Sequence, residues 1–246
     1  MNHSNTSSIF DVPFYNGSQA TLVDELYQSF PSLNQFQIVT ANPEILMKTK
    51  KNNDYHTLVQ QTNLVVPDGI GVVIASRLLK KPLQERITGF DLLLQFLSYA
   101  NEQQLSVAFV GTTSIRLKKA VDWIKTQYPS IHLYAHHGYY QKENEATIIE
   151  ELSAFHPDFL FVGTGAPAQD FFIHQYKENI RFKVGMGIGG CLDVLSGEVN
   201  RAPLLWQKCH LEWLYRMIQE PKRWIRFGQL PLFLLHVLVD KWRKNV

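Results

Sequence analysis

The sequence has few cysteines and no long apolar run. Its two cysteines, Cys191 and Cys209, are too few for a disulfide framework and fit a reducing compartment. The longest apolar run, residues 230–239, contains Pro231 and His236 and is far shorter than the roughly 20 apolar residues that a membrane-spanning helix needs. The first ten residues are polar and lack the apolar segment of a secretory signal. We therefore expect the protein to stay in the cytoplasm.

The sequence also lacks an Asp-x-Asp pair, a common means of holding a divalent cation. His132, His136 and His137 form an unconvincing metal set, because adjacent side chains on a strand point to opposite faces. Cys191 could be a weak nucleophile, but a small buried side chain is the favoured interpretation. We expect neither a metal nor a cofactor.

Charge is distributed unevenly along the chain. The net charge of +2 hides a division at residue 201. Residues 202–246 carry eight basic and three acidic residues and four of the five tryptophans, whereas residues 1–201 carry 16 basic and 19 acidic residues. This contrast predicts an α/β domain over residues 1–201 and a basic helical appendage over residues 202–246.

Between residues 35 and 190, β-rich runs alternate with helical patterns. This alternation predicts βαβ units and therefore a Rossmann-like, mostly parallel sheet with flanking helices. Residues 159–162 are apolar throughout, as expected of a strand covered on both faces. The predicted strands are residues 36–40, 64–66, 106–110, 131–134, 159–162 and 183–186. The predicted helices are residues 43–50, 70–79, 91–101, 114–128, 144–155 and 169–179.

Glycines and polar residues directly follow five of these predicted strands. The carboxyl ends of parallel strands lie at one edge of the sheet, where open α/β sheets bind ligands. Each loop alone could need glycine for its turn, or Thr, Asn or Asp for a helix cap. Together they favour a site for a polar, phosphate-bearing ligand. The loops begin at residues 40, 67, 111, 163 and 185.

Two side chains in or near these loops have alternative interpretations. Asp68 could cap the following helix, or it could act as a general base that takes a proton from a sugar hydroxyl. Arg86 could hold a diphosphate or be an ordinary surface arginine.

The spacing of Gly185, Gly187 and Gly190 matches a dinucleotide fingerprint. It comes late in the chain, however, and Gly197 and Pro203 interrupt any following helix. A backbone cradle beside a sugar nucleotide is therefore favoured. A nicotinamide-dependent oxidoreductase is the weaker alternative.

The appendage has the composition of an interfacial helix. Arg223 and Arg226 are three residues apart and would share a helical face. Basic, Trp-rich helices lie at the surface of a bilayer, although an oligomer contact or a helix packed on the domain could use the same residues. Exposed apolar surface could also drive self-association into a homo-oligomer. We expect no nucleic acid partner, because the acidic body would repel a polyanion. We expect the appendage to be mobile or displaced when no membrane is present.

Six motifs occur in an order that resembles a known family. They are Thr-Ala-Asn-Pro-Glu at residues 40–44, Pro-Asp-Gly at 67–69, Glu-Arg-Ile-Thr-Gly-Phe-Asp at 85–91, Val-Gly-Thr-Gly-Ala-Pro-Ala-Gln at 162–169, Gly-Ile-Gly-Gly at 187–190, and Arg-Ala-Pro followed by Leu-Glu-Trp-Leu-Tyr-Arg and Glu-Pro-x-Arg-Trp at 201–224. The chain resembles the WecG/TagA/CpsF glycosyltransferase family, most closely its TagA branch.

The resemblance implies an inverting reaction. N-acetylmannosamine would move from UDP-ManNAc to undecaprenyl-diphosphate-linked GlcNAc in a β-1,4 linkage, an early step of wall teichoic acid synthesis. The enzyme would be peripheral on the inner face of the membrane. Related branches use N-acetylmannosaminuronic acid or glucose, so a different UDP-sugar donor for another surface polysaccharide is the alternative. Ala168, Asp170, Cys191 and Leu192 depart from the usual family residues and bear on the identity of the donor.

The resemblance also implies roles for particular residues. Asp68 would be the catalytic base, and Arg86 would stabilise the diphosphate. No metal is implied, so arginines and backbone amides would neutralise the leaving UDP. The residues implied to bind substrate are Thr40, Asn42, Arg86, Gly163, Gln169, Gly187, Gly189, Gly190, Arg216, Arg223 and Arg226.

Overall fold

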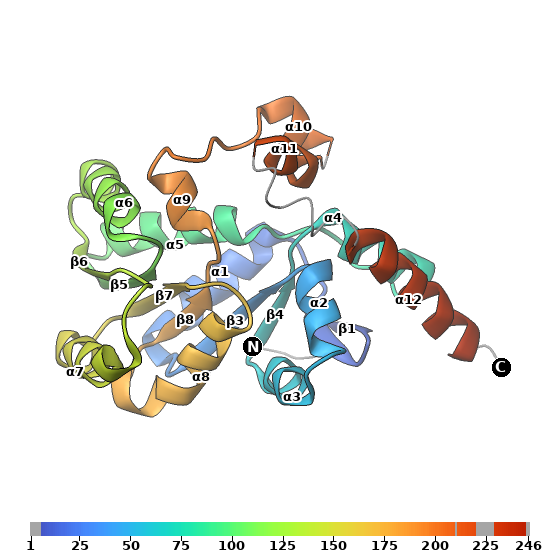
Figure 1. Ribbon diagram of the computed structural model, residues 1–246, viewed down its shortest axis with the longest axis horizontal. Helices are drawn as coiled ribbons and strands as arrows, with labels where there is room; N and C mark the ends of the chain where they lie inside the picture. Colours follow the sequence, from blue (N-terminus) through green and yellow to red (C-terminus); the bar gives the residue numbers. More distant parts are fainter. Residues whose placement is uncertain (1–5, 210, 220–228, 245–246) are drawn as a thin grey trace.

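The computed structural model describes residues 6–209, 211–219 and 229–244. Its centre is a six-stranded parallel sheet in the order β4-β3-β8-β7-β5-β6 (Figure 1). The predicted α/β class is confirmed, and each strand predicted from the sequence is present. The strands are β3 (Phe36–Ala41), β4 (Leu64–Pro67), β5 (Ser106–Gly111), β6 (His132–His136), β7 (Phe159–Gly163) and β8 (Val184–Gly187).

Helices cover both faces of the sheet. Alternate residues along β7 explain this, since Phe159 and Phe161 enter one apolar cluster whereas Leu160 and Val162 enter another. The first face packs against α1 (Gln19–Ser29), α5 (Gly89–Glu102), α6 (Ser114–Gln127) and α9 (Cys191–Leu195). The second packs against α2 (Pro43–Thr49), α3 (Asn53–Gln61), α7 (Glu145–Phe155) and α8 (Ala168–Ile180). Helix α4 (Ile70–Leu78) follows β4, and the short helices η1 (Phe30–Ser32) and η2 (Lys142–Asn144) lie in connections.

A β-hairpin precedes the sheet. Strands β1 (Thr6–Ile9) and β2 (Val12–Tyr15) pair antiparallel. Their two-residue turn places Phe10 at φ 51° and Asp11 at φ 62°, as a type I′ hairpin turn requires. Phe10 is buried, and its ring meets Phe233 edge-on at 5.7 Å between centroids. The hairpin therefore contributes to a cluster that includes the C-terminal helix.

Within the described residues after the central domain there are three helices. They are α10 (Leu204–Lys208), α11 (Glu212–Gln219) and α12 (Gln229–Lys244). Figure 1 shows α10 and α11 together above the body, and α12 beside α4. No helix in the described part of the chain is long and apolar enough to cross a membrane.

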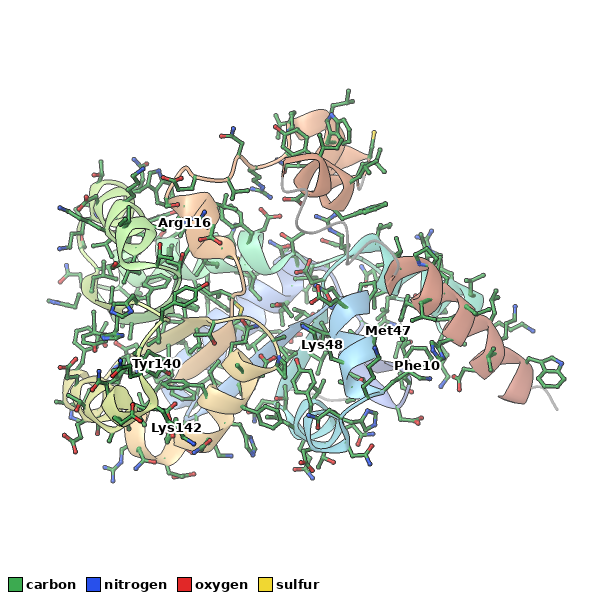
Figure 2. The ribbon with its side chains drawn as sticks, viewed as in Figure 1. Phe10, Met47, Lys48, Arg116, Tyr140 and Lys142 are labelled. Atoms are coloured by element: carbon green, nitrogen blue, oxygen red, sulfur yellow. The ribbon has the colours of Figure 1, made fainter. Side chains whose placement is uncertain are left out.

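Helix α12 is docked on the body, so the expectation of a displaced appendage is wrong for this helix. Phe233 and Val237, four residues apart, are fully buried in the cluster that also contains Val72 of α4. Phe10 and Met47, labelled in Figure 2, belong to the same cluster from the hairpin and from α2. One face of α12 therefore has an apolar partner without any membrane.

Candidate active site

The strand ends bring the predicted site residues to one edge of the sheet. In the parallel register, Ala41 lies opposite Pro67, and Val162 lies opposite Gly187. The loops that begin after these residues therefore emerge side by side. This edge is where an open α/β sheet binds its ligand.

Asp68 is half-buried directly after β4. Its backbone N–H donates to the Ala41 carbonyl at 3.0 Å, which fixes the residue beside the end of β3. The N-cap of α4 is Gly69, at φ 110°, and this residue has no side chain to cap the helix. The interpretation of Asp68 as the helix cap is therefore wrong. Its role as a base remains a prediction.

Arg86 lies in the loop between α4 and α5, close to Asp68 in space. The next residue, Ile87, donates its N–H to the Pro67 carbonyl at 3.0 Å, so the two loops run together. The Arg86 side chain is only 11% exposed, and its Nη2 lies 3.0 Å from Glu212 Oε2 on α11. Arg86 is therefore not an ordinary surface arginine.

Thr40 and Asn42 occupy the end of β3. Thr40 is buried, and its hydroxyl donates to the Gly187 carbonyl over a long 3.4 Å. The Asn42 side chain accepts from Ile45 N–H at 3.0 Å and caps α2. The capping alternative for Asn42 therefore holds, and its contact with a donor sugar remains a prediction.

Gln169 ties two glycine-rich loops together. Its Oε1 accepts from the N–H of Gly165 at 3.2 Å and from that of Gly189 at 3.0 Å. A Cβ at Gly187 would collide with the Gln169 amide, so any other residue there would displace this buried side chain. Gln169 is buried, and this geometry supports a role in shaping the loops after β7 and β8.

The remaining glycines of the predicted site lie in or beside the same loops, and their role as a backbone cradle remains a prediction. Gly163 packs against the backbone of the Gly189 loop, and Gly190 immediately precedes α9. Helix α9 has only five residues. This is a poor match to the long helix of a dinucleotide-binding unit, as the position of Gly197 led us to expect.

Asp170, noted in the sequence only as a departure from the family pattern, is a buried carboxyl group next to Gln169. Asp170 is fully buried, and Oδ2 accepts from the Tyr55 hydroxyl at 2.6 Å. Burial raises the pKa of Asp170 to about 6, although hydrogen bonds from Tyr55 and Gln169 oppose this shift. The signal available in the sequence was only an acid next to the Gln169 motif.

A second cluster of polar side chains lies after β5. The Thr112 hydroxyl donates to Asp193 Oδ1 at 2.6 Å, and Arg116 Nη1 lies 3.1 Å from the same oxygen. Figure 2 labels Arg116 on α6, facing α9. The helices after β5 and β7 pack on opposite faces of the sheet, the arrangement at which α/β proteins bind ligands.

His136 and His137 lie in a different part of the molecule from Asp68. His136 and His137 have ring centroids 4.6 Å apart, because β6 ends at His136 and His137 lies outside it. The expectation that they point to opposite faces is therefore wrong. An open hollow of about 360 Å³ adjoins them between α6 and β6, at the far edge of the sheet from Asp68. Among the described residues no three His, Cys, Asp or Glu side chains gather as a metal site would require.

The arginines predicted on the appendage are only partly placed. Arg216 belongs to α11, whose residue Glu212 contacts Arg86. Arg223 and Arg226 lie outside the described residues. Their contacts with phosphates remain predictions.

A parallel α/β sheet with a carboxylate, an arginine and glycine loops at its strand ends is the architecture of many enzymes that bind phosphorylated ligands. The model of the glycosyl transferase WecG/TagA/CpsF family matches residues 7–246. The chain belongs to this family and is a glycosyltransferase.

Several relatives resemble the chain over nearly its whole length. A protein of Bacillus spizizenii is 35% identical over 95% of this chain and 91% of its own length. One of Bacillus subtilis strain 168 is 34% identical over 98% and 94%, and one of Staphylococcus aureus strain MW2 is 36% identical over 97% and 95%. Each is named N-acetylglucosaminyldiphosphoundecaprenol N-acetyl-beta-D-mannosaminyltransferase.

Proposed function

We propose that this glycosyltransferase moves N-acetylmannosamine from UDP-ManNAc to undecaprenyl-diphosphate-linked GlcNAc, forming a β-1,4 linkage in wall teichoic acid synthesis. The proposal draws on the shared name of the relatives and on their coverage of both chains. The observation that supports a transfer site most directly is the placement of Asp68 and Arg86 on adjacent loops, joined by the bond from Ile87 to Pro67.

In the proposed step, Asp68 takes the proton from the 4-hydroxyl of the acceptor GlcNAc. The acceptor oxygen then forms a bond to C1 of the donor sugar as the bond from C1 to the UDP oxygen breaks. Attack from the face opposite the leaving group inverts the configuration at C1. The half-buried position of Asp68 suits this role, because a base must reach substrate and yet be shielded from bulk water.

The departing UDP carries the charge that develops in this step. Arg86 lies on the loop adjoining Asp68, and backbone N–H groups of the glycine loops other than those of Gly165 and Gly189 are the expected further donors. We propose that these groups, with arginines of the appendage, stabilise the diphosphate without a metal ion. The polar groups after β5 and the glycines after β7 offer a place for the nucleotide.

We propose that residues 202–246 act as the membrane-binding appendage and hold the enzyme at the inner face of the membrane. The outer face of α12 supports this part of the proposal, since its apolar side chains have no covering element in the described structure. They are Leu232, Leu235, Leu238, Val239 and Trp242. A lipid-linked acceptor would reach the site from the same membrane.

The test is UDP release from a panel of UDP-sugars, with and without lipid-linked GlcNAc. Acceptor-dependent release from UDP-ManNAc is the expected result. Release only from UDP-ManNAcA or UDP-glucose would replace the donor but keep the reaction class. Release from none of the donors would contradict the proposed function.

A further inference from the structure

Four charged side chains connect α11 to the loop that carries Arg86. Arg86 Nη2 lies 3.0 Å from one oxygen of Glu212, and Arg201 Nε lies 3.8 Å from the other. Arg201 Nη2 in turn lies 2.5 Å from Asp91 Oδ1. Basic and acidic side chains alternate in this series, in the order Arg86, Glu212, Arg201 and Asp91. Each side chain therefore lies beside a side chain of opposite charge.

The ion pair of Arg86 with Glu212, at one end of this series, is well shielded from water. The side chains of Arg86 and Glu212 are 11% and 12% exposed, whereas those of the Lys119–Glu198 pair are 55% and 35% exposed. A shielded ion pair is screened less than an exposed one, and loss of one partner leaves an uncompensated charge. Removal of the Glu212 carboxylate would leave the Arg86 and Arg201 guanidinium groups without the anion between them.

Hydrogen bonds hold the loop that carries Arg86, and the start of α5, beside the candidate base Asp68. Asp91 Oδ2 accepts from the Thr88 hydroxyl at 2.6 Å, and Thr88 caps α5. The intervening Ile87 bonds to Pro67, the residue before Asp68. Arg201 also lies over the Phe90 ring at 4.9 Å. Glu212 on α11 is therefore in direct contact with the loop that lies beside Asp68.

We propose that Glu212 is a positioning residue that orients the Arg86 guanidinium toward the donor diphosphate. The guanidinium is planar and has five N–H donors, so contact of Nη2 with a carboxylate fixes the plane while leaving other donors to face a phosphate. Through this contact, the appendage acts on the reaction as well as on the membrane. The inference rests on the proposed function, in which Arg86 stabilises the leaving UDP.

A double-mutant cycle tests this inference. Glu212→Gln keeps the size of the side chain but removes its charge. We expect it to lower kcat for UDP release by about tenfold or more, with a smaller change in the donor KM, because the charge on the diphosphate grows as UDP leaves. In an Arg86→Ala background, the same substitution should have little further effect, because Glu212 acts through Arg86. Glu212→Asp, which keeps the carboxylate, should restore part of the activity.

The control is Glu198→Gln, which removes the exposed ion pair with Lys119 and should leave kcat unchanged. The melting temperature of each variant shows whether a loss of activity reflects unfolding. Equal effects of Glu212→Gln in the two backgrounds, or undiminished activity of Glu212→Gln, would overturn the inference. If the parent enzyme releases UDP from no donor, the proposed function fails. In that case the affinity for UDP is measured for the same four proteins. If the effects of the substitutions at positions 86 and 212 are coupled, the inference is supported, and if the two effects are additive, it is overturned.

Discussion

Asp68 owes its position to backbone hydrogen bonds on either side of it. Its own N–H bonds to Ala41, and the preceding Pro67 carbonyl accepts from Ile87. These bonds hold the loops after β3 and β4 and the loop before α5 against one another. The side chain of Asp68 thus projects from a rigid edge, which is what a base needs if it is to meet a substrate hydroxyl at a fixed distance.

Substitution of this side chain gives a direct prediction. Asp68→Asn keeps the shape but cannot accept a proton at neutral pH, so UDP release should fall about 100-fold or more. UDP affinity should stay within about twofold, because the predicted contacts of the nucleotide lie elsewhere. Steady-state kinetics and calorimetric titration with UDP measure the two quantities. Retention of full turnover by the variant would remove Asp68 from the catalytic role.

The buried carboxyl group of Asp170 predicts a dependence of stability on pH. Burial raises its pKa from an ordinary 3.8 to about 6 in the folded chain. Between these values the folded state binds more protons than the unfolded state. The free energy of unfolding therefore falls as pH rises from about 4 to 6, by about 2 to 3 kcal/mol in total from this group.

Asp170→Asn cannot ionise and should lack this decline. Urea unfolding of both proteins between pH 4 and 7 measures it. The constant cost of the substitution cancels when only the change with pH is compared. Parallel curves for the two proteins would contradict the predicted shift, whereas a parent curve that declines relative to the variant would support it.

At the scale of elements, periodicity and apolar runs were sufficient to predict the sheet. Each predicted strand is present, and in β7 the four residues from Phe159 to Val162 are buried, as their apolar run predicts. The N-terminal hairpin had no such signal. Its turn uses Phe10 and Asp11 at positive φ, where Asn-Gly would be the usual sign. Packing of Phe10 against Phe233 outweighs the local preference, and packing between distant segments cannot be read from local sequence.

The site was predictable to a similar extent. Strand-end loops and family motifs drew attention to Asp68, Arg86 and Gln169. The Arg86–Glu212 pair was not predictable, because it joins residues 126 positions apart across a segment whose docking no pattern indicates. The pairing of Tyr55 with Asp170 was not predictable for the same reason, since the two residues come from α3 and α8.

The docking of α12 predicts unequal roles for its two faces. Phe233 is fully buried against the hairpin and α2, whereas Leu235 is 58% exposed. Phe233→Ala should lower the free energy of unfolding by about 3 kcal/mol or more, since it opens a cavity. Leu235→Ala should change it by less than about 0.5 kcal/mol. Urea titrations of both variants provide the measurement, and equal effects would show that α12 is not packed on the body.

At the scale of the whole molecule, charge and apolar surface are separated between two parts. The body has an excess of acidic residues, whereas residues 202–246 have an excess of basic residues. The exposed apolar side chains of the appendage occur on the outer face of α12 and also on α10 and α11, at Leu204, Leu205 and Ile218. Basic and apolar groups together suit an anionic bilayer, which attracts cations at its surface and takes up apolar side chains beneath it.

This separation predicts which surface of the protein binds the membrane. Leu235 and Leu238 are on the outer face of α12, and partial burial of each in lipid contributes about 1 kcal/mol or more. The double variant Leu235→Asp with Leu238→Asp should therefore lower binding to vesicles containing anionic lipid by at least about tenfold, because it also adds two charges that the surface repels. Cosedimentation measures the bound fraction.

The matched control is Ile115→Asp on α6, an exposed apolar residue outside the appendage. It should leave vesicle binding unchanged, and added salt should weaken binding of the parent without abolishing it, because the apolar contribution is not screened. Equal loss of binding in the control would show that any exposed isoleucine or leucine contributes. If the double variant instead binds vesicles normally and changes only the mass in sedimentation, the outer face of α12 joins two copies of the chain. The membrane would then be met through another surface, since the apolar face of α12 would already be covered.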